Sequence, residues 1–121
     1  DNGLRNQVAF RFSGDSGKLL ENVVFLQLKR DCSEVYYYKN KKECDFLIKE
    51  KNKITKAIQV TDVLTEANKE RELNGLLSAM ESFNLKKGSV ITRNQEEKLR
   101  LQGKEIRIIP IYKWLIGEQE E

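Results

Sequence analysis

The chain has 121 residues, enough for one domain with a single core but too few for two. Hydrophobic residues make up 39% of it and charged residues 34%, which is typical of a globular domain with a heavily charged surface. The net charge of +3 is too small to indicate a nucleic-acid partner by itself, and the absence of histidine excludes the commonest general base and metal ligand.

The first predicted element after the N-terminus is a helix over residues 18–30, where apolar side chains recur at helical spacing. Asp15 and Ser16 are N-cap candidates, and residues 8–12 before them alternate in a short extended pattern. Glu21 falls on this helix among apolar neighbours. On the helix alone, the simpler interpretation is a solvated acid at the helix edge.

The central part of the chain predicts three consecutive antiparallel strands, over residues 34–39, 43–49 and 54–61. Short turns rich in Lys and Asn separate them, as in many hairpins. The first strand contains the run Tyr36 to Tyr38. These rings could stack on nucleic-acid bases, although such a run more often alternates between the core and the surface of a sheet.

The middle strand carries an acid, Asp45, between large apolar residues. Alternation places Cys44, Phe46 and Ile48 on one face and Glu43, Asp45 and Leu47 on the other. In the next strand, alternation separates Ile58 and Val60 from Ala57, Gln59 and Thr61. A carboxylate among apolar neighbours must be paired, protonated or bound to a metal. Asp45 is therefore the main candidate functional residue, and the alternative is a structural acid bonded to Arg71 or to a backbone amide.

Residues 62–84 predict a second helix, with Asp62 or Thr65 as its N-cap and an apolar core face between Leu73 and Phe83. Residues 89–92 predict a buried strand, parallel to its neighbour because a helix precedes it.

The C-terminal part predicts a hairpin over residues 97–102 and 104–109, which Pro110 ends. The resulting order is helix, three antiparallel strands, helix, strand and terminal hairpin. This order predicts an α/β fold with a mixed sheet and helices on its faces, formed by one domain over residues 1–121.

This order of elements resembles the core of the PD-(D/E)xK nuclease superfamily, the restriction-endonuclease-like fold. In that family an acid lies in the second strand, and an acid or Gln followed two residues later by Lys lies in the third. By this resemblance Asp45 is the second-strand acid, Gln59 occupies the acid-or-Gln position, and Glu21 is the acid of the first helix. Thr61 stands where the family has Lys, which implies a weak or inactive nuclease site. Without Asp45, Gln59 would be a buried amide that ties strands together.

The whole chain also resembles an uncharacterised C-terminal domain of bacterial and archaeal AAA-type ATPases. Six short motifs follow one another in the same order: Gly3-Leu4-Arg5-Asn6, Gly17-Lys18-Leu19-Leu20-Glu21-Asn22, Glu43-Cys44-Asp45-Phe46, Ile58-Gln59-Val60, Arg71-Glu72-Leu73 and Ile109-Pro110. The resemblance implies an ATPase domain upstream in the same prokaryotic chain. We expect no ATP site within this fragment, because it contains no P-loop motif.

The nuclease resemblance implies Mg²⁺ or Mn²⁺ as the cofactor, with oxygen ligands from Asp45, Gln59 and Glu21. The leading hypothesis is a nuclease-fold accessory domain that cuts weakly or not at all and serves recognition or assembly for the ATPase. The alternatives are a Mg²⁺-dependent DNA or RNA endonuclease and a metal-independent nucleic-acid binding module.

Two surfaces are candidates for partners. Lys41, Lys42, Lys51 and Lys53 lie in the predicted turns and suit contacts with DNA or RNA phosphates, although solvated turns commonly have this composition. Apolar residues near the two ends are candidates for docking the ATPase domain: Val8, Phe10, Phe12, Tyr112, Trp114 and Leu115.

Cys32 and Cys44 lack the spacing of metal-binding cysteines and favour free thiols in a reducing compartment, with a disulfide between them as the alternative. No apolar run approaches transmembrane length and no signal peptide is recognisable. We therefore expect a cytoplasmic protein without a membrane partner. Because the sequence begins at Asp1, we also expect it to be a piece of a longer chain.

Overall fold

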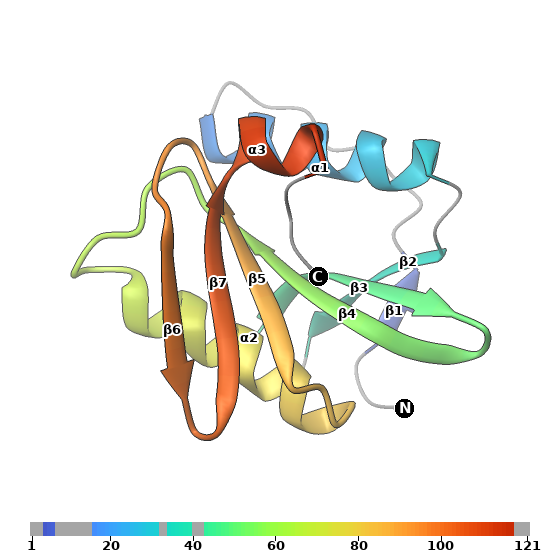
Figure 1. Ribbon diagram of the computed structural model, residues 1–121. Helices are drawn as coiled ribbons and strands as arrows, with labels where there is room; N and C mark the ends of the chain where they lie inside the picture. Colours follow the sequence, from blue (N-terminus) through green and yellow to red (C-terminus); the bar gives the residue numbers. More distant parts are fainter. Residues whose placement is uncertain (1–3, 7–15, 32–33, 40–42, 118–121) are drawn as a thin grey trace.

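The computed structural model describes residues 4–6, 16–31, 34–39 and 43–117. The described strands are β1 (Leu4–Asn6), β2 (Glu34–Lys39), β3 (Glu43–Glu50), β4 (Lys53–Val60), β5 (Lys87–Thr92), β6 (Glu97–Leu101) and β7 (Lys104–Pro110). The described helices are α1 (Ser16–Arg30), α2 (Lys69–Ser82) and α3 (Ile111–Leu115). The strands form one seven-stranded sheet in the order β1-β2-β3-β4-β5-β7-β6, as Figure 1 shows.

The sheet is mixed. β1 to β4 are antiparallel, β5 is parallel to both β4 and β7, and β6 is antiparallel to β7. The predicted meander, the parallel strand after the second helix and the terminal hairpin are therefore confirmed. Lys51 and Asn52 connect β3 to β4 with φ of 54° and 68°, the left-handed conformation that a two-residue hairpin turn requires.

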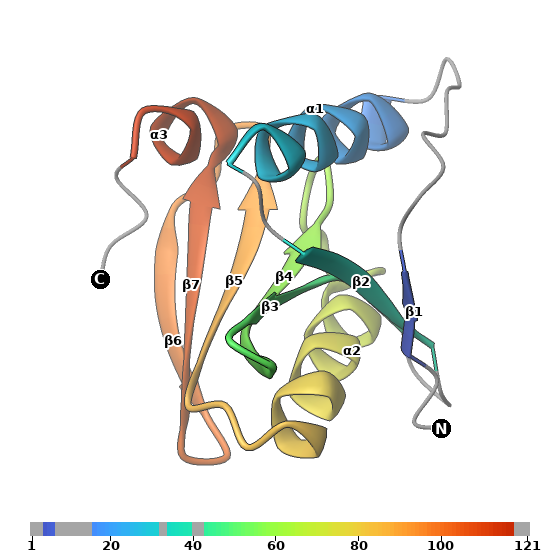
Figure 2. The same cartoon turned by 90° about the vertical axis from the view of Figure 1, so that its right-hand side faces the viewer.

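The two faces of the sheet carry separate cores. α2 covers one face, while α1 and α3 lie over one end of the other face (Figure 2). Under α2, Leu76 and Met80 pack against strand residues such as Leu47. Under α1 and α3, Val24 and Trp114 pack against residues such as Ile91. No helix in the described ranges is both long and apolar enough to cross a lipid bilayer.

Trp114 corrects one expectation about the C-terminal segment. Only 7% of Trp114 is exposed, so it belongs to the core and not to a docking surface. Tyr112 and Leu115 on the same helix are 57% and 42% exposed. Residues 8–12, the other part of the predicted docking surface, lie outside the described residues.

α2 packs closely against Gly88 in β5. A Cβ atom built at Gly88 would lie 2.6 Å from the sulfur of Met80 and 3.2 Å from a methyl carbon of Leu76. Because real Cβ contacts are longer than this, any larger residue at position 88 would displace the helix or its side chains. Glycine at this position therefore sets the depth at which α2 packs.

The expected alternation in β3 fails at Cys44. Cys44 packs with Leu47 under α2, whereas Phe46 and Ile48 pack under α1, so the prediction that Cys44 shares their face was wrong. The register with β2 gives the reason: two steps along β2 match three steps from Leu47 to Cys44 on β3. A β-bulge therefore reverses the alternation next to Asp45. Cys44 is a free, buried thiol, and burial raises its pKa; Cys32 lies outside the described residues.

The second helix begins later than predicted. α2 starts at Lys69, seven residues after Asp62, and its N-cap is Asn68, whose side chain makes no capping hydrogen bond. Asp62 does not cap the helix because its carboxylate binds Arg93, with an Nε–Oδ1 distance of 2.7 Å. The Thr65 hydroxyl accepts the Asn68 N–H, which precedes the helix, and the Thr65 N–H donates to the Asn68 side chain. Residues 61–68 therefore form a loop between β4 and α2.

Candidate functional site

An open cleft of about 530 Å³ lies where α1, the end of β4 and the start of α2 meet. Its lining combines acidic, basic and small polar side chains from these elements: Gly17, Lys18, Glu21, Asp45, Val60, Thr61, Asp62, Val63, Asn68, Arg71 and Glu72. Two of the three predicted site residues, Asp45 and Glu21, line this cleft. The third, Gln59, does not.

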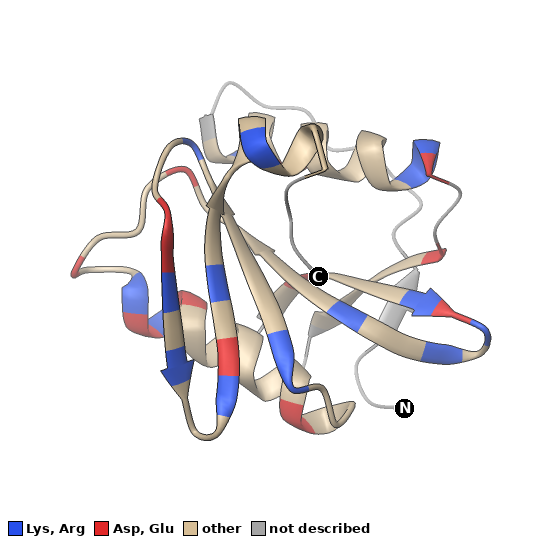
Figure 3. Cartoon of the chain, in the orientation of Figure 1, with Lys and Arg blue, Asp and Glu red and all other residues tan. Residues whose placement is uncertain are grey.

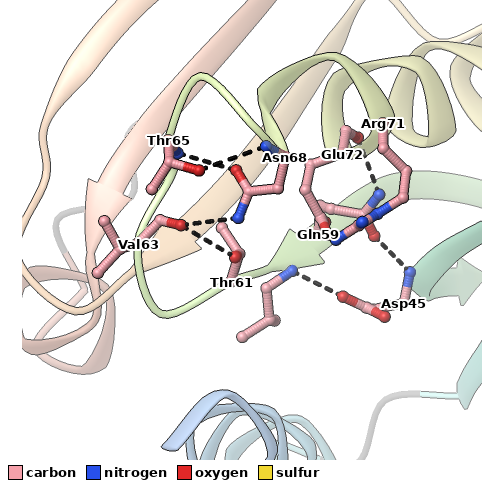
Figure 4. Close-up of polar contacts among 9 residues, drawn as sticks. Asp45, Gln59, Thr61, Val63, Thr65, Asn68, Arg71 and Glu72 are labelled. Atoms are coloured by element: carbon pink, nitrogen blue, oxygen red, sulfur yellow. Dashed lines mark hydrogen bonds and ion pairs between the residues drawn. The ribbon is translucent and has the colours of Figure 1, made fainter.

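Asp45 completes the β3–β4 ladder with its side chain. Backbone pairing between these strands extends only to Phe46 and Ile58. Beyond that pair, the Val60 N–H donates to Oδ2 of Asp45 at 2.9 Å, as Figure 4 shows. The predicted structural interpretation of Asp45, a bond to a backbone amide, is therefore present in the structure. The second oxygen of the carboxylate is not used in this bond.

Gln59 bonds at both ends of its amide. Its Oε1 accepts the Asp45 N–H at 2.8 Å, and its Nε2 donates to the Glu72 carbonyl at 2.9 Å. The side chain is buried and ties β3, β4 and α2 together (Figure 4). Gln59 thus forms the strand-tying contacts expected of a buried amide, which is the other interpretation that the sequence offered beside a metal ligand. Its side-chain oxygen already accepts a hydrogen bond from a backbone amide.

Glu21 and Asp45 come together across the cleft from α1 and β3. Burial, and then the negative charge of Glu21, raise the pKa of the Asp45 carboxyl well above its usual range. The Val60 amide opposes this shift, and the charge of Glu72 adds to it. Lys18 lies 3.7 Å from Glu21 on the same helix. Glu21 is therefore a cleft residue that interacts with Asp45, and not an isolated acid at the helix edge.

The position at which the nuclease family has Lys also lies in the cleft. Thr61 follows β4 and lines the cleft, and its hydroxyl lies 3.5 Å from the Val63 carbonyl. The cations of the cleft, Lys18 and Arg71, each lie beside a glutamate, and Arg71 contacts Glu72 at 3.2 Å. Arg71, the other predicted structural partner of Asp45, therefore forms an ion pair with Glu72.

The oxygen atoms available in the cleft can be compared with the ligands that a divalent cation needs. Mg²⁺ is commonly held by one or two carboxylates and several waters. Glu21 and Asp45 supply two carboxylates, but Gln59 is turned away, and the described part of the chain holds no cluster of three or more Asp, Glu, Cys or His side chains arranged around one ion. Metal binding by Asp45, Gln59 and Glu21 therefore stays a prediction, in which Gln59 Oε1 already accepts the Asp45 N–H.

The loop of residues 61–68 that forms one wall of the cleft is held by side chains from the loop that follows the neighbouring strand β5. Arg93 binds both carboxylate oxygens of Asp62, and the Gln95 amide bonds both the N–H and the carbonyl of Leu64. Sequence reasoning missed Arg93 and Gln95. Each is 31 residues from its partner, so no local pattern indicates the contact.

The predicted lysine-rich turns are only partly described. Lys51 and Lys53 are exposed at the β3–β4 turn, while Lys41 and Lys42 lie outside the described residues. In β2, Tyr38 is buried and its hydroxyl lies 2.8 Å from Oγ of Ser82, and Lys49 lies over the ring of Tyr36. Tyr36 and Tyr38 thus have structural contacts within the domain.

Comparison with known proteins gives a family but no activity. Residues 16–114 match the family described as a domain of unknown function (DUF4143). The chain is also 41% identical to the uncharacterized protein MJ1544 of Methanocaldococcus jannaschii, over 85% of this chain and 25% of that protein. The chain thus spans about a quarter of the length of this relative. Since the family match covers α1 to α3 nearly completely, the chain belongs to the DUF4143 family.

Proposed function

We propose that this chain is an accessory domain with a nuclease-like fold and a site that does not cut, and that it serves recognition or assembly within a longer ATPase chain. The arrangement of Gln59 carries the first part of this proposal. Its amide is bonded to two backbone groups, so it cannot turn an oxygen to the cleft without breaking both bonds.

The chemistry of the cleft supports a non-cutting site. Hydrolysis of a phosphodiester needs a group that activates water and a cation that stabilises charge on the phosphoryl oxygens. Thr61 supplies neither, and Lys18 and Arg71 lie beside glutamates that offset their charge. The negative charge of Glu21, which lines the cleft, disfavours a phosphate beside it.

Two observations support a role in assembly. The relative from Methanocaldococcus jannaschii is much longer than this chain, so an ATPase domain has room in a chain of that length. The outer surface of α1 also exposes Leu19, Val23 and Leu26, which are 44%, 40% and 53% exposed at helical spacing. Such a stripe on a soluble helix is typical of a surface that another domain covers.

The test for cutting is a set of incubations of the chain with plasmid DNA, single-stranded DNA and RNA in millimolar Mg²⁺ or Mn²⁺. We expect no cleavage above that of Asp45→Ala. Metal-dependent cleavage by the wild-type chain that Asp45→Ala abolishes would establish the endonuclease alternative instead. Thr61→Lys restores the residue type that the resemblance expects in this position, and cleavage by that variant alone would show which group the wild-type cleft lacks.

The endonuclease alternative has one observation in its favour, the meeting of Glu21 and Asp45. Titration with Mn²⁺ during amide NMR tests it without relying on activity, because a bound paramagnetic ion broadens nearby signals. Localised broadening around Asp45 that Glu21→Gln also removes would establish a metal site.

For assembly, Val23→Glu in the full-length protein is expected to release the domain from its neighbour. Limited proteolysis at the junction between the two domains measures this release.

A further inference from the structure

One half of the sheet face that carries α1 and α3 is not covered by either helix. The covered half is marked by Ile58, Ile91 and Ile109, which pack against α1 and α3 in one core. Alternate residues along these strands share that face. Following β4, β5 and β7 away from the helices therefore identifies the side chains of the uncovered half.

The side chains found in this way are mostly basic. On β7, Arg107 and Glu105 precede Ile109 in the sequence and share its face. On β5, Ser89 and Lys87 precede Ile91 and share its face. On β4, Lys56 pairs with Ile48, whose side chain belongs to the same core.

The edge strand β6 adds two more cations to the same half. Lys98 pairs directly with Arg107, and Arg100 pairs directly with Glu105. Paired residues in an antiparallel ladder share a face. We name this set the basic sheet face: Lys56, Lys87, Lys98, Arg100 and Arg107. Figure 3 shows basic segments on β4, β5, β6 and β7 in this half of the sheet.

The side chains of the basic sheet face are available at the surface. Lys56, Lys87, Lys98 and Arg100 are exposed, and Arg107 is partly buried. Glu105 is the one acid among them, and it pairs in register with both Lys87 and Arg100. The positive charge is therefore in excess, and it comes from four strands that lie side by side.

The composition of this face indicates the chemistry of its partner. Among the described residues, the large exposed apolar side chains lie on α1, α3 and the loop at Val63, and none lies on β4 to β7. A folded protein partner is usually anchored by apolar or aromatic side chains, which this face does not offer. An anionic polymer with regularly spaced charges needs only cations.

We propose that the basic sheet face binds the sugar-phosphate backbone of nucleic acid. Adjacent strands lie about 4.8 Å apart, so the cations form a grid that can contact several successive phosphates. No aromatic ring belongs to this set, so binding is independent of sequence and does not use base stacking. It also needs no metal, which separates it from the acidic cleft at the C-terminal end of β4 and from the proposed function there.

The test measures fluorescence anisotropy of a labelled DNA duplex with the 121-residue chain in EDTA, over a series of salt concentrations. The wild-type chain is expected to bind at low salt with an affinity that falls steeply as salt rises. Lys98→Gln/Arg100→Gln is expected to weaken binding by roughly tenfold and to reduce the slope of log K against log salt by about 1.8, since each lost phosphate contact removes about 0.9.

Lys51→Gln/Lys53→Gln is the matched control, because it also removes two exposed cations from a hairpin. It is expected to keep wild-type affinity within about twofold. Equal weakening by the two double variants would overturn the assignment to this face, and so would a wild-type chain that does not bind at low salt. Displacement of the DNA by polyglutamate at equal charge concentration would assign the face to an acidic protein segment and overturn the nucleic-acid proposal. Far-UV circular dichroism confirms that each variant is folded.

Discussion

At the scale of single residues, the cleft shows why position 59 holds an amide and not an acid. One end of the side chain must accept a hydrogen bond from the Asp45 N–H, and the other must donate one to the Glu72 carbonyl. Glutamine is the side chain of this length that does both. The same atom that a metal would need is therefore the atom that replaces a missing rung of the β3–β4 ladder.

Gln59→Leu removes both bonds while keeping the volume of the side chain. We expect it to lower the free energy of unfolding by about 2 kcal/mol, because the buried Asp45 N–H loses its partner. Gln59→Glu is expected to destabilise as well, because it replaces the donor with an oxygen that faces the Glu72 carbonyl. Urea denaturation measures both variants. Wild-type stability of both would show that the two bonds contribute nothing.

Asp45→Asn tests the acid pair through its dependence on pH. The folded-state pKa of Asp45 is raised above its unfolded value of about 4, so the folded state binds the proton more tightly. The wild-type protein is therefore expected to lose stability as pH rises from about 4 towards the folded pKa. Asn does not titrate, keeps an oxygen for the Val60 amide and offers an N–H to Glu21.

The variant is thus expected to show less pH dependence than the wild type and to be the more stable of the two at about pH 8. The measurement is the urea midpoint between about pH 4 and pH 8 in EDTA, so that no metal contributes. Glu21→Gln should flatten the same curve, because it removes the nearest negative charge. Parallel curves for the wild type and Asp45→Asn would contradict the proposed interaction.

At the scale of elements, the loop of residues 61–68 is held in place by tertiary contacts and not by its own conformational preference. Its sequence contains good helix N-caps, Asp62 and Thr65, yet α2 begins only at Lys69. Arg93 and Gln95, from the loop after β5, bond to Asp62 and Leu64 instead. Local capping chemistry therefore competes with contacts from a distant segment, and the distant contacts prevail.

Gln95→Ala is expected to loosen this loop without unfolding the domain. The Leu64 N–H, bonded to Gln95 at 2.7 Å, should exchange with solvent at least about tenfold faster in the variant. The Leu85 N–H, which bonds to the Met80 carbonyl at the far end of α2, is the internal control and should not change. Hydrogen exchange followed by NMR reports both amides, and equal changes at the two would mean general destabilisation.

Strands β2 to β7, in their order along the chain, could be predicted because each depends on local alternation and turn composition; β1 and the order of the strands within the sheet were not predicted. The bulge in β3 could not, because it depends on the register between Leu47 in β3 and its partner Tyr36 in β2. For the site, the family resemblance named Glu21 and Asp45 as candidates, but the sequence left open whether they meet in space. The two bonds of Gln59 depend on α2 packing beside β4. The basic sheet face was missed because its cations are spread over four strands, although Lys98 and Arg100 already alternate within one of them.

At the scale of the whole molecule, one sheet separates two cores that share no helix. α2 covers one core and α1 with α3 covers the other, so within the described ranges only strands contribute to both. On β4, β5 and β7, successive side chains belong to opposite cores, as Ala57 and Ile58 do. A loss of packing on one face must therefore be transmitted to the other through the strands.

Leu76→Ala tests this coupling, because Leu76 lies under α2 while Trp114, the single tryptophan, lies in the opposite core. We expect the variant to lose about 3 kcal/mol of stability, since the cavity it leaves is fully buried. Trp114 fluorescence and far-UV circular dichroism should shift to the same lower urea midpoint. A Trp114 transition that keeps the wild-type midpoint would show that the two cores unfold separately.

The position of β7 between β5 and β6 has a consequence for synthesis on the ribosome. β2, β3 and β4 pair with neighbours in sequence and can associate as soon as they emerge, but β5 has an unpaired side and β6 has no partner at all until β7 is made. The nascent chain therefore carries an incomplete sheet, with β5 at its open edge, until Pro110 has left the exit tunnel. A truncation before β7 would leave β6 without a partner and one edge of β5 unpaired, so β7 is the segment whose synthesis completes the sheet.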